Sequence, residues 1–361
     1  MDGTIILTGA SGALGQELAK QLLLRPQSYT FLFPVRSRQN AHAQKLQQLL
    51  DTHGTGVHTA SMPEVDLASF ASIRAFVSDV NSKVSTGEIP PIRALILNAA
   101  FFFQRSGLRL TEQQTKNQPP FEMHFAVNHL ANVLLTLLLL ESMDPQHGRI
   151  VYTSSWAHDP NRPENQRSAP EKLPWDVGEL AHPDMRKFES DPTRNRDPEA
   201  EGMRRYGASK MALITFMHAL RKRLDKVPRL ENISIVGVDP GGMLHEHVVE
   251  RASWANRIST VPLIRLYVLL VAQYWWPNGM FRTVKKSAQD LLHATLESNA
   301  SWVQPKDAYF NGNRPAESAA ESKDPERQKE LWQMSLGYVE LEESHTALDA
   351  SFKRPPDKPR V

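Results

Sequence analysis

A tyrosine and a lysine four residues apart, Tyr206 and Lys210, have the types and spacing to do chemistry together. They lie in the stretch RRYGASKMAL, residues 204–213, with small residues between them. If the stretch is helical, this spacing places both side chains on one face, about one turn apart. A phenol has a pKa near 10, and a neighbouring ammonium charge favours its ionised form. The pair therefore indicates either a proton-transfer site or an ordinary solvated helix start.

A glycine-rich segment follows the first apolar run of the chain. The run Thr4–Leu7 is succeeded by TGASGALG, residues 8–15, with glycine at positions 9, 12 and 15. Glycine lets a backbone approach a pyrophosphate closely, and a helix that follows offers unpaired amides and the positive end of its dipole. Such turns also occur where a strand simply meets a helix. The position directly after the first strand favours a dinucleotide-binding loop.

The end of the second apolar run bears on the type of dinucleotide. It reads FPVRSRQN and places Arg36, Ser37 and Arg38 where an NAD-selective protein usually carries an acid for the ribose hydroxyls. An arginine there suits the 2′-phosphate of NADP. The alternative is that both arginines are solvated loop residues. The sequence predicts NADP(H) as the cofactor.

Apolar runs alternate with helical patterns as far as residue 240. This alternation predicts an α/β fold of the Rossmann type, with one doubly wound parallel sheet covered by helices on both faces. The expected single domain spans residues 1–341. The expected strands are Thr4–Leu7, Thr30–Val35, Val57–Ser61, Ala94–Leu97, Arg149–Thr153 and Ile233–Val238, and the expected helices are Gln16–Leu24, His42–Asp51, Ser72–Val84, Phe125–Met143 and Tyr206–Asp225.

Two segments depart from this alternation. Residues 157–205 contain seven prolines and charges of both signs with little apolar periodicity. That composition predicts a long, largely irregular surface insertion just before Tyr206. Residues 342–361 have the composition of a flexible tail.

Composition limits the classes of function. Of the 361 residues, 40% are hydrophobic and 23% are charged, which is typical of a soluble globular protein, and the net charge of +2 gives no reason to expect a nucleic-acid partner. The absence of cysteine excludes disulfides and thiolate chemistry. No signal peptide is evident, the apolar run Leu266–Trp276 is too short to span a bilayer, and no grouping has metal-ligand spacing. We expect a cytoplasmic protein without a metal.

These features together resemble the short-chain dehydrogenase/reductase family over residues 4–245. The resemblance implies a Rossmann-type fold and hydride transfer between a nicotinamide cofactor and a carbonyl compound. The residues that carry it are TGASGALG, Asp66–Leu67, LNAA at Leu97–Ala100, the helix VNHLAN with Asn128, IVYTSS ending at Ser155, YGASK at Tyr206–Lys210, and DPGG at 239–242.

The resemblance implies a role for four residues. Tyr206 would be the general acid for the carbonyl oxygen, and Lys210 would favour the phenolate and hold the nicotinamide ribose. Ser155 would donate a hydrogen bond to the substrate oxygen, with Ser154 as the alternative serine. Asn128 would hold a water in a proton relay, or else be a core asparagine. The implied cofactor contacts are Gly9, Ser11, Gly12, Ala13, Leu14, Gly15, Arg36, Ser37, Arg38, Asp66, Leu67, Asn98, Ala99, Ala100, Tyr206, Lys210, Pro240, Gly241, Gly242 and Met243.

The substrate side departs from the family pattern. Ser155 and Tyr206 are 51 residues apart, where most relatives have a short loop, and His245 stands in place of the family's threonine after the Pro-Gly turn. Residues 243–285, the family's lid segment, are rich in aromatic and aliphatic side chains. These could line a pocket for a lipophilic molecule, face a membrane surface, or pack on the core or another subunit. The implied substrate contacts are Ser155, Trp156, Tyr206, Met243 and Leu244.

The sequence thus predicts an NADPH-dependent reductase or dehydrogenase acting on a bulky lipophilic ketone or alcohol, such as a steroid-, retinoid- or polyketide-like biosynthetic intermediate. The later part of the chain resembles retinol-dehydrogenase-like reductases. Two alternatives have the same motifs: a cofactor-binding regulatory protein, and an isomerase or cyclase without net redox. The expected partners are the small substrate, a second copy in a homodimer, and a membrane surface touched peripherally.

Overall fold

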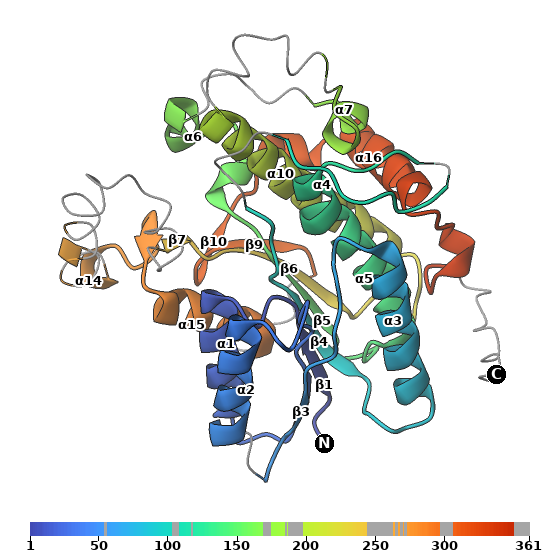
Figure 1. Cartoon of the computed structure of the whole chain (residues 1–361), viewed down its shortest axis with the longest axis vertical. Coiled ribbons are helices and arrows are strands. Elements are labelled where there is room, and N and C mark those ends of the chain that lie inside the picture. The colour runs from blue at the N-terminus through green and yellow to red at the C-terminus, as the bar shows by residue number, and fades with distance from the viewer. Residues whose placement is uncertain are drawn as a thin grey trace.

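The centre of the computed structural model is an eight-stranded sheet in the order β10-β9-β6-β5-β4-β1-β2-β3 (Figure 1). All neighbouring strands are parallel except β9 and β10, which are antiparallel. The structure describes residues 1–349 apart from 54–55, 103–107, 117, 169–174, 185, 187–197, 244–262, 264–265, 268–269, 271–272 and 297–305. The predicted α/β fold with a doubly wound parallel sheet is confirmed, except that the edge strand β10 runs antiparallel to β9.

The elements have the following bounds. The strands are β1 Thr4–Leu7, β2 Thr30–Leu32, β3 Thr59–Ser61, β4 Ile92–Leu97, β5 Arg149–Thr153, β6 Ser234–Asp239, β7 Gly242–Met243, β8 Phe281–Arg282, β9 Ala308–Asn311 and β10 Arg314–Ala316. The α-helices are α1 Ala13–Leu23, α2 Ala41–His53, α3 Phe70–Ser85, α4 Met123–Phe125, α5 Ala131–Leu139, α6 Pro163–Ser168, α7 Val177–Ala181, α10 Pro198–Leu224, α14 Gln273–Trp275, α15 Val284–Leu296 and α16 Pro325–Tyr338. A π-helix spans Ala126–Leu130, and 3-10 turns span Leu140–Ser142, Trp156–His158, Ala320–Lys323 and Glu343–His345.

Each face of the sheet has its own hydrophobic core. Successive strand side chains point to opposite faces, so in β1 Ile5 and Leu7 join one core while Ile6 joins the other. Helices α1, α2 and α15 cover the first face, and α3, α5, α10 and α16 cover the second (Figure 1). With both faces covered, every residue of β1, β5 and β6 is buried, as near-continuous apolar runs predict.

The helix predicted over Phe125–Met143 is interrupted. Residues Ala126–Leu130 form a π-helix between α4 and α5, and Asn128 lies in it. The run Met123–Ser142 is long and apolar enough to cross a membrane, but 89% of its most apolar window is buried inside the fold. It packs against α3 and α10 as a core helix.

The insertion before Tyr206 is more ordered than its composition indicates. Ala157 and His158 are buried, α7 contributes Val177 and Ala181 to a core, and α10 begins at Pro198. The expectation of a largely irregular segment up to residue 205 is therefore wrong for these parts. The prolines and charges predict an exposed loop, but the charged side chains at the start of α10 are buried and paired within the fold.

The C-terminal region also packs on the core as far as the structure describes it. Ala347 and Leu348 belong to the same core as α10 and α16. The predicted tail, residues 342–361, is thus packed up to Asp349, and the remainder lies outside the described residues. Most of the expected lid also lies outside them, including Leu244 and His245.

Candidate active site

The carboxyl ends of β1, β4, β5 and β6 open into one cavity of about 490 Å³. Because parallel strands end at the same edge of a sheet, residues far apart in sequence meet there. The lining joins the glycine loop to the tyrosine and serine of the predicted chemistry. It consists of Thr8, Gly9, Ser11, Gly12, Ala13, Leu14, Gly15, Pro34, Val35, Arg36, Val65, Asp66, Leu67, Ala68, Asn98, Ala99, Ala100, Phe101, Phe102, Val127, Thr153, Ser154, Ser155, Tyr206, Lys210, Pro240, Gly241 and Met243.

The glycine loop is shaped by positions that no side chain could occupy. Gly9 has φ +70°, and a Cβ on Gly15 would lie 2.1 Å from the carbonyl oxygen of Gly9. The loop leads directly into α1, whose first turn presents its free amides to the cavity. The Asn98 side chain, at the end of β4, donates to the Thr8 carbonyl at 3.1 Å. This backbone cradle fits the phosphates of a dinucleotide.

The three residues predicted to select the cofactor, Arg36, Ser37 and Arg38, have different surroundings in the structure. Arg36 lines the cavity with an exposed side chain, 3.9 Å from the Asp66 carboxylate. Arg38 instead donates its Nε to the Met62 carbonyl at 2.7 Å, and the Ser37 hydroxyl accepts from the amide of Gln39. Neither Ser37 nor Arg38 is among the described lining residues. The structure brings Arg36 alone of the three to the cavity.

The Tyr206 side chain lies at the cavity wall and hydrogen-bonds the Ser155 hydroxyl. Of the two candidate serines, Ser155 therefore meets the tyrosine, whereas the Ser154 hydroxyl accepts from Tyr309 at 3.4 Å. Burial raises the pKa of Tyr206 to about 12, against the opposing effect of the bond to Ser155. The phenol is thus protonated at neutral pH and poised as a donor.

Lys210 is buried at the cavity floor one helical turn from Tyr206. Its Nζ donates to the Thr153 carbonyl at 2.8 Å and lies 5.7 Å from the centre of the tyrosine ring. Burial lowers the pKa of Lys210 to about 8. Its charge is therefore sensitive to the pH near neutrality, and it lies where an ammonium would stabilise a phenolate.

Asn128 lies behind the cavity and is not among its described lining residues. Its side chain accepts from the Phe101 amide at 2.6 Å and donates to the Phe101 carbonyl and the Ser209 hydroxyl at 3.0 and 2.9 Å. The Asn128 carbonyl, in the π-helix, accepts from Asn132. The amide thus ties the segment after β4 to the helix that carries Tyr206 and Lys210, so Asn128 is a positioning residue.

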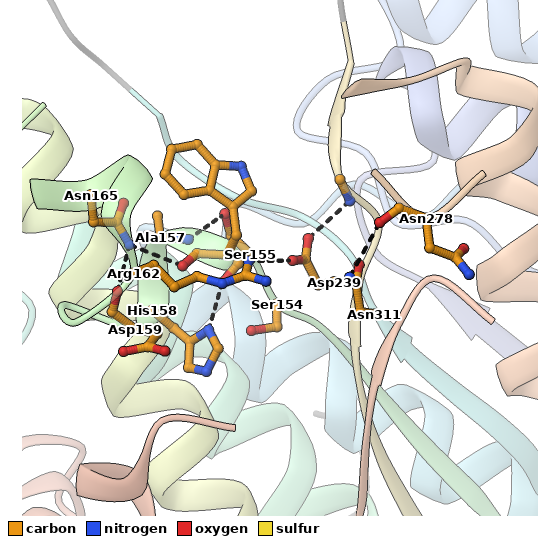
Figure 2. Close-up of polar contacts among 12 residues, drawn as sticks. Ser154, Ser155, Ala157, His158, Asp159, Arg162, Asn165, Asp239, Asn278 and Asn311 are labelled. Carbon is orange, nitrogen blue, oxygen red and sulfur yellow. Dashed lines mark hydrogen bonds and ion pairs between the residues drawn. The ribbon is translucent and has the colours of Figure 1, made fainter. Parts of the chain in front are cut away.

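Ser155 is held by the turn that begins the insertion (Figure 2). Its Oγ accepts from the Ala157 amide at 3.2 Å, and the same hydroxyl hydrogen-bonds Tyr206 at the cavity wall. Its carbonyl receives Nδ1–H of His158 at 2.7 Å, because Nε2 of the same ring accepts from the Ala319 amide at 3.0 Å and so carries no proton. His158 thereby ties the serine to the connection after β10.

His158 is one of the functional residues that the sequence reasoning missed. Its side chain is buried, and desolvation lowers its pKa, so the ring stays neutral. The ring also lies 4.9 Å from that of Tyr309. In the sequence, its one signal is its position three residues after Ser155. Two of its partners, Tyr309 at Nδ1 and Ala319 at Nε2, come from more than 150 residues away in the chain.

A second missed residue, Arg282, holds the turn after β6. Its guanidinium donates to the Asp239 carbonyl at 2.9 Å and lies 3.7 Å from the buried Asp290. Gly241 has φ +74°, and a Cβ there would lie 2.9 Å from the Arg282 Nε. On the other side of the turn, Arg162 lies 3.7 Å from the Asp239 carboxylate (Figure 2). Two arginines thus fix the turn that presents Pro240 to the cavity.

The substrate end of the cavity is lined by Phe101, Phe102, Ser155 and Met243. The Phe102 ring packs edge-on against Tyr206, with 4.8 Å between ring centres. Both phenylalanines directly follow LNAA in the sequence, but neither is among the predicted substrate contacts. Of the other predicted contacts, Trp156 and Gly242 are not among the described lining residues, and Leu244 lies outside the described residues.

The two arginines just before Tyr206 anchor its helix. Arg204 and Arg205 are both buried and both pair with Glu201, at 2.8 and 2.9 Å. Arg205 also lies 3.8 Å from Glu179 of α7. These ion pairs neutralise charges that the sequence alone suggests are solvated, and they connect the insertion to the catalytic helix.

Within the described part of the chain, no group of three or more His, Asp or Glu side chains could hold a metal ion.

Comparison with known proteins places this geometry in a family. The short chain dehydrogenase family matches residues 3–166. The short-chain dehydrogenase iccH of Talaromyces variabilis is 35% identical, and the match covers 96% of this chain and 98% of that relative. The chain belongs to the short-chain dehydrogenase family. Retinol dehydrogenase 14 of Mus musculus is 28% identical over 92% of this chain and 84% of its own length.

Solved structures share the fold of this short-chain dehydrogenase. L-sorbose reductase from Gluconobacter frateurii, in complex with NADPH and L-sorbose, has a TM-score of 0.55 at 17% identity, covering 88% of this chain and 97% of that one. The chain is therefore an oxidoreductase of a family that binds a nicotinamide cofactor, and the sequence resemblance to that family is confirmed.

Proposed function

We propose that this short-chain dehydrogenase is an NADPH-dependent reductase that interconverts a ketone and an alcohol of a bulky lipophilic molecule. The observation that carries the proposal is the hydrogen bond between Tyr206 and Ser155 at the wall of the cavity that also contains the glycine loop. The proton donor Tyr206 and the glycine loop that fits a dinucleotide thus line the same cavity. When bound, the nicotinamide cofactor supplies the hydride.

The side chains of this protein supply the proton and the polar support. Ser155 donates its hydroxyl proton toward the carbonyl oxygen, where negative charge develops. Tyr206 gives that oxygen its phenolic proton and regains one afterwards. The pKa of Tyr206 near 12 keeps the phenol protonated at neutral pH, which suits reduction, and the Lys210 ammonium stabilises the phenolate that results. Asn128 and His158 hold the two flanking segments in place.

Arg36 supports NADPH as the form of the cofactor. Its guanidinium at the cavity rim is exposed and lies 3.9 Å from the Asp66 carboxylate, a loose solvent-exposed pair that leaves it available to bind a 2′-phosphate. Arg36→Leu should lower kcat/KM with NADPH roughly ten- to a hundredfold and leave the value with NADH nearly unchanged.

Arg38→Leu is the matched control for cofactor selection. Its guanidinium is bonded to the Met62 carbonyl, outside the described cavity lining, so the ratio of NADPH to NADH activity should stay at the wild-type value. Equal effects of the two substitutions, or an unchanged preference in Arg36→Leu, would remove Arg36 from cofactor selection.

The lipophilic substrate is supported by Phe101, Phe102 and Met243 at the substrate end. Relatives named retinol dehydrogenase and polyprenol dehydrogenase point to the same class of substrate. The test is NADPH consumption with product analysis across a panel of retinal, 3-ketosteroids, aromatic polyketide-type ketones and small hydrophilic ketones. We expect turnover to concentrate in the lipophilic members. A preference for the hydrophilic ketones would contradict the substrate class but not the reaction.

A further inference from the structure

Among the described residues between 263 and 280, eight large apolar side chains are exposed. Trp275 and Tyr274 are 75% and 74% exposed, and Leu263 is 67% exposed. Monomeric soluble proteins rarely gather exposed apolar side chains in this way without a partner. We call this set the 263–280 surface: Leu263, Leu266, Tyr267, Leu270, Tyr274, Trp275, Trp276 and Met280.

The structure decides among the three uses that the sequence allowed for these residues. None of the eight is among the described residues that line the cavity. None belongs to either described hydrophobic core. Neither a substrate pocket nor core packing therefore accounts for the described side chains, and an external surface remains.

The 263–280 surface is attached directly to the substrate end of the cavity. The carbonyl of Met280 accepts from the Gly242 amide at 2.7 Å, and β8 pairs with β7 so that Arg282 lies beside Met243. Met243 lines the cavity. Figure 1 shows α14, which carries Tyr274 and Trp275, at the edge of the molecule beyond β7 and away from the sheet. The helix that carries the two aromatic side chains therefore lies at the periphery of the described structure.

Charge and side-chain type indicate the kind of partner. Tryptophan and tyrosine are the side chains that favour the boundary between lipid headgroups and acyl chains. The sequence 251–289 contains no aspartate or glutamate, and Lys285 is exposed. The basic residues of the segment 251–289 are Arg251, Arg257, Arg265, Arg282, Lys285 and Lys286. Two of them, Arg282 and Lys286, pair with Asp290. Aromatic residues within a basic segment complement an anionic lipid surface.

We propose that the 263–280 surface docks the enzyme on the anionic surface of a membrane, without crossing it. A symmetric contact between two copies would find no acidic residue within 251–289 to complement its basic ones, which disfavours a second copy as the partner. The docked orientation places the substrate end of the cavity next to the lipid. Docking would thus give the enzyme access to lipophilic molecules dissolved in the bilayer. That last step rests on the proposed function, whereas docking itself does not.

Vesicle flotation with the full-length protein tests docking independently of any substrate. We expect the protein to float with vesicles of phosphatidylcholine containing 30% phosphatidylserine, less with pure phosphatidylcholine, and less again at high salt. Tryptophan emission should shift to the blue on binding. Trp275→Ser together with Trp276→Ser should weaken the partition into anionic vesicles by roughly tenfold or more, because two large apolar surfaces are lost from the contact.

Leu24→Ser is the matched control, because Leu24 is 62% exposed and lies on the opposite end of α1 from the cavity. It should float like the wild type, and both variants should keep the wild-type melting temperature and affinity for NADPH. The proposal is overturned if the wild type does not float, or if the double variant floats equally well. It is also overturned if light scattering shows a dimer that the double substitution dissociates while vesicle binding is absent, since the surface would then join two copies.

Discussion

The two ends of the cavity are held in place by different means. The glycine loop is shaped by its own backbone, because Gly15 packs directly against the carbonyl of Gly9, six residues earlier in the chain. Ser155 depends on side chains from elsewhere, since His158 links it to Ala319 and Arg162 links the same turn to Asp239. A site made by local backbone geometry is visible in a sequence motif, whereas one made by distant side-chain contacts is not.

Substituting Gly15 should have the largest effect on stability and cofactor binding, because it disrupts the end of the cavity that the backbone of the glycine loop forms. A Cβ at this position would lie 2.1 Å from the Gly9 carbonyl oxygen and 2.7 Å from the Ala10 Cα, and neither backbone atom can yield cheaply. We expect Gly15→Ala to destabilise the fold by about 3 kcal/mol or more and to abolish measurable binding of NADPH. Chemical denaturation and cofactor fluorescence measure the two effects.

Gly337→Ala provides the control for that substitution. Gly337 lies in α16, and a Cβ there would meet nothing within 4 Å. Alanine in a helix should stabilise the protein by about 0.5–1 kcal/mol and leave cofactor binding unchanged. If Gly15→Ala behaved like Gly337→Ala, the loop would not be limited by backbone contact.

Substituting His158 should disturb the Ser155 end of the cavity, which depends on side-chain contacts, and leave the glycine loop unchanged. His158→Leu leaves the buried Ala319 amide without its partner and removes one of the two hydrogen bonds to the Ser155 carbonyl, which should cost about 1–3 kcal/mol of stability. We expect kcat to fall roughly ten- to a hundredfold because Ser155 shifts, while the dissociation constant of NADPH stays the same.

The exposed His147 offers the control for that change. His147→Leu should alter neither kcat nor stability measurably, because its side chain is mostly in solvent. A drop in NADPH affinity in His158→Leu, equal to its loss of kcat, would mean that the two ends of the cavity are not held separately.

The smallest expected effect is a pH dependence that comes from Lys210. Its pKa is about 8 in the fold and 10.5 ordinarily, so between these values the unfolded chain binds more protons and stability rises with pH. Above pH 10 the raised pKa of Tyr206 acts in the opposite direction, because the folded protein then binds more protons. From pH 8 to 10 the wild type should gain about 2 kcal/mol relative to Lys210→Met.

Thermal melts of both proteins and of Lys20→Met, which removes an exposed lysine, measure this difference. The Lys20 variant should follow the wild-type profile. Parallel profiles for wild type and Lys210→Met would show that burial does not depress the pKa of Lys210.

The features that the sequence could predict are those formed by local backbone geometry, and the ones it could not predict depend on distant side-chain contacts. The bounds of β1 and β5, the glycine loop, and the approach of Ser155 to Tyr206 follow from local apolar runs and motifs. The start of α10 could not be predicted, because Arg204 and Arg205 look solvated until Glu201 is seen to pair with them. His158 and Arg282 gained their roles only through contacts that the fold creates.

The central claim is that Tyr206 delivers the proton in a cavity that binds the nicotinamide cofactor. The most direct test compares Tyr206→Phe with the wild type, using NADPH and the panel ketone that the wild type reduces fastest. We expect kcat/KM to fall by about 10²–10⁴ with no change in the dissociation constant of NADPH, because the ring remains and only the proton donor is lost. A Tyr206→Phe protein that reduced the ketone at the wild-type rate would contradict the account.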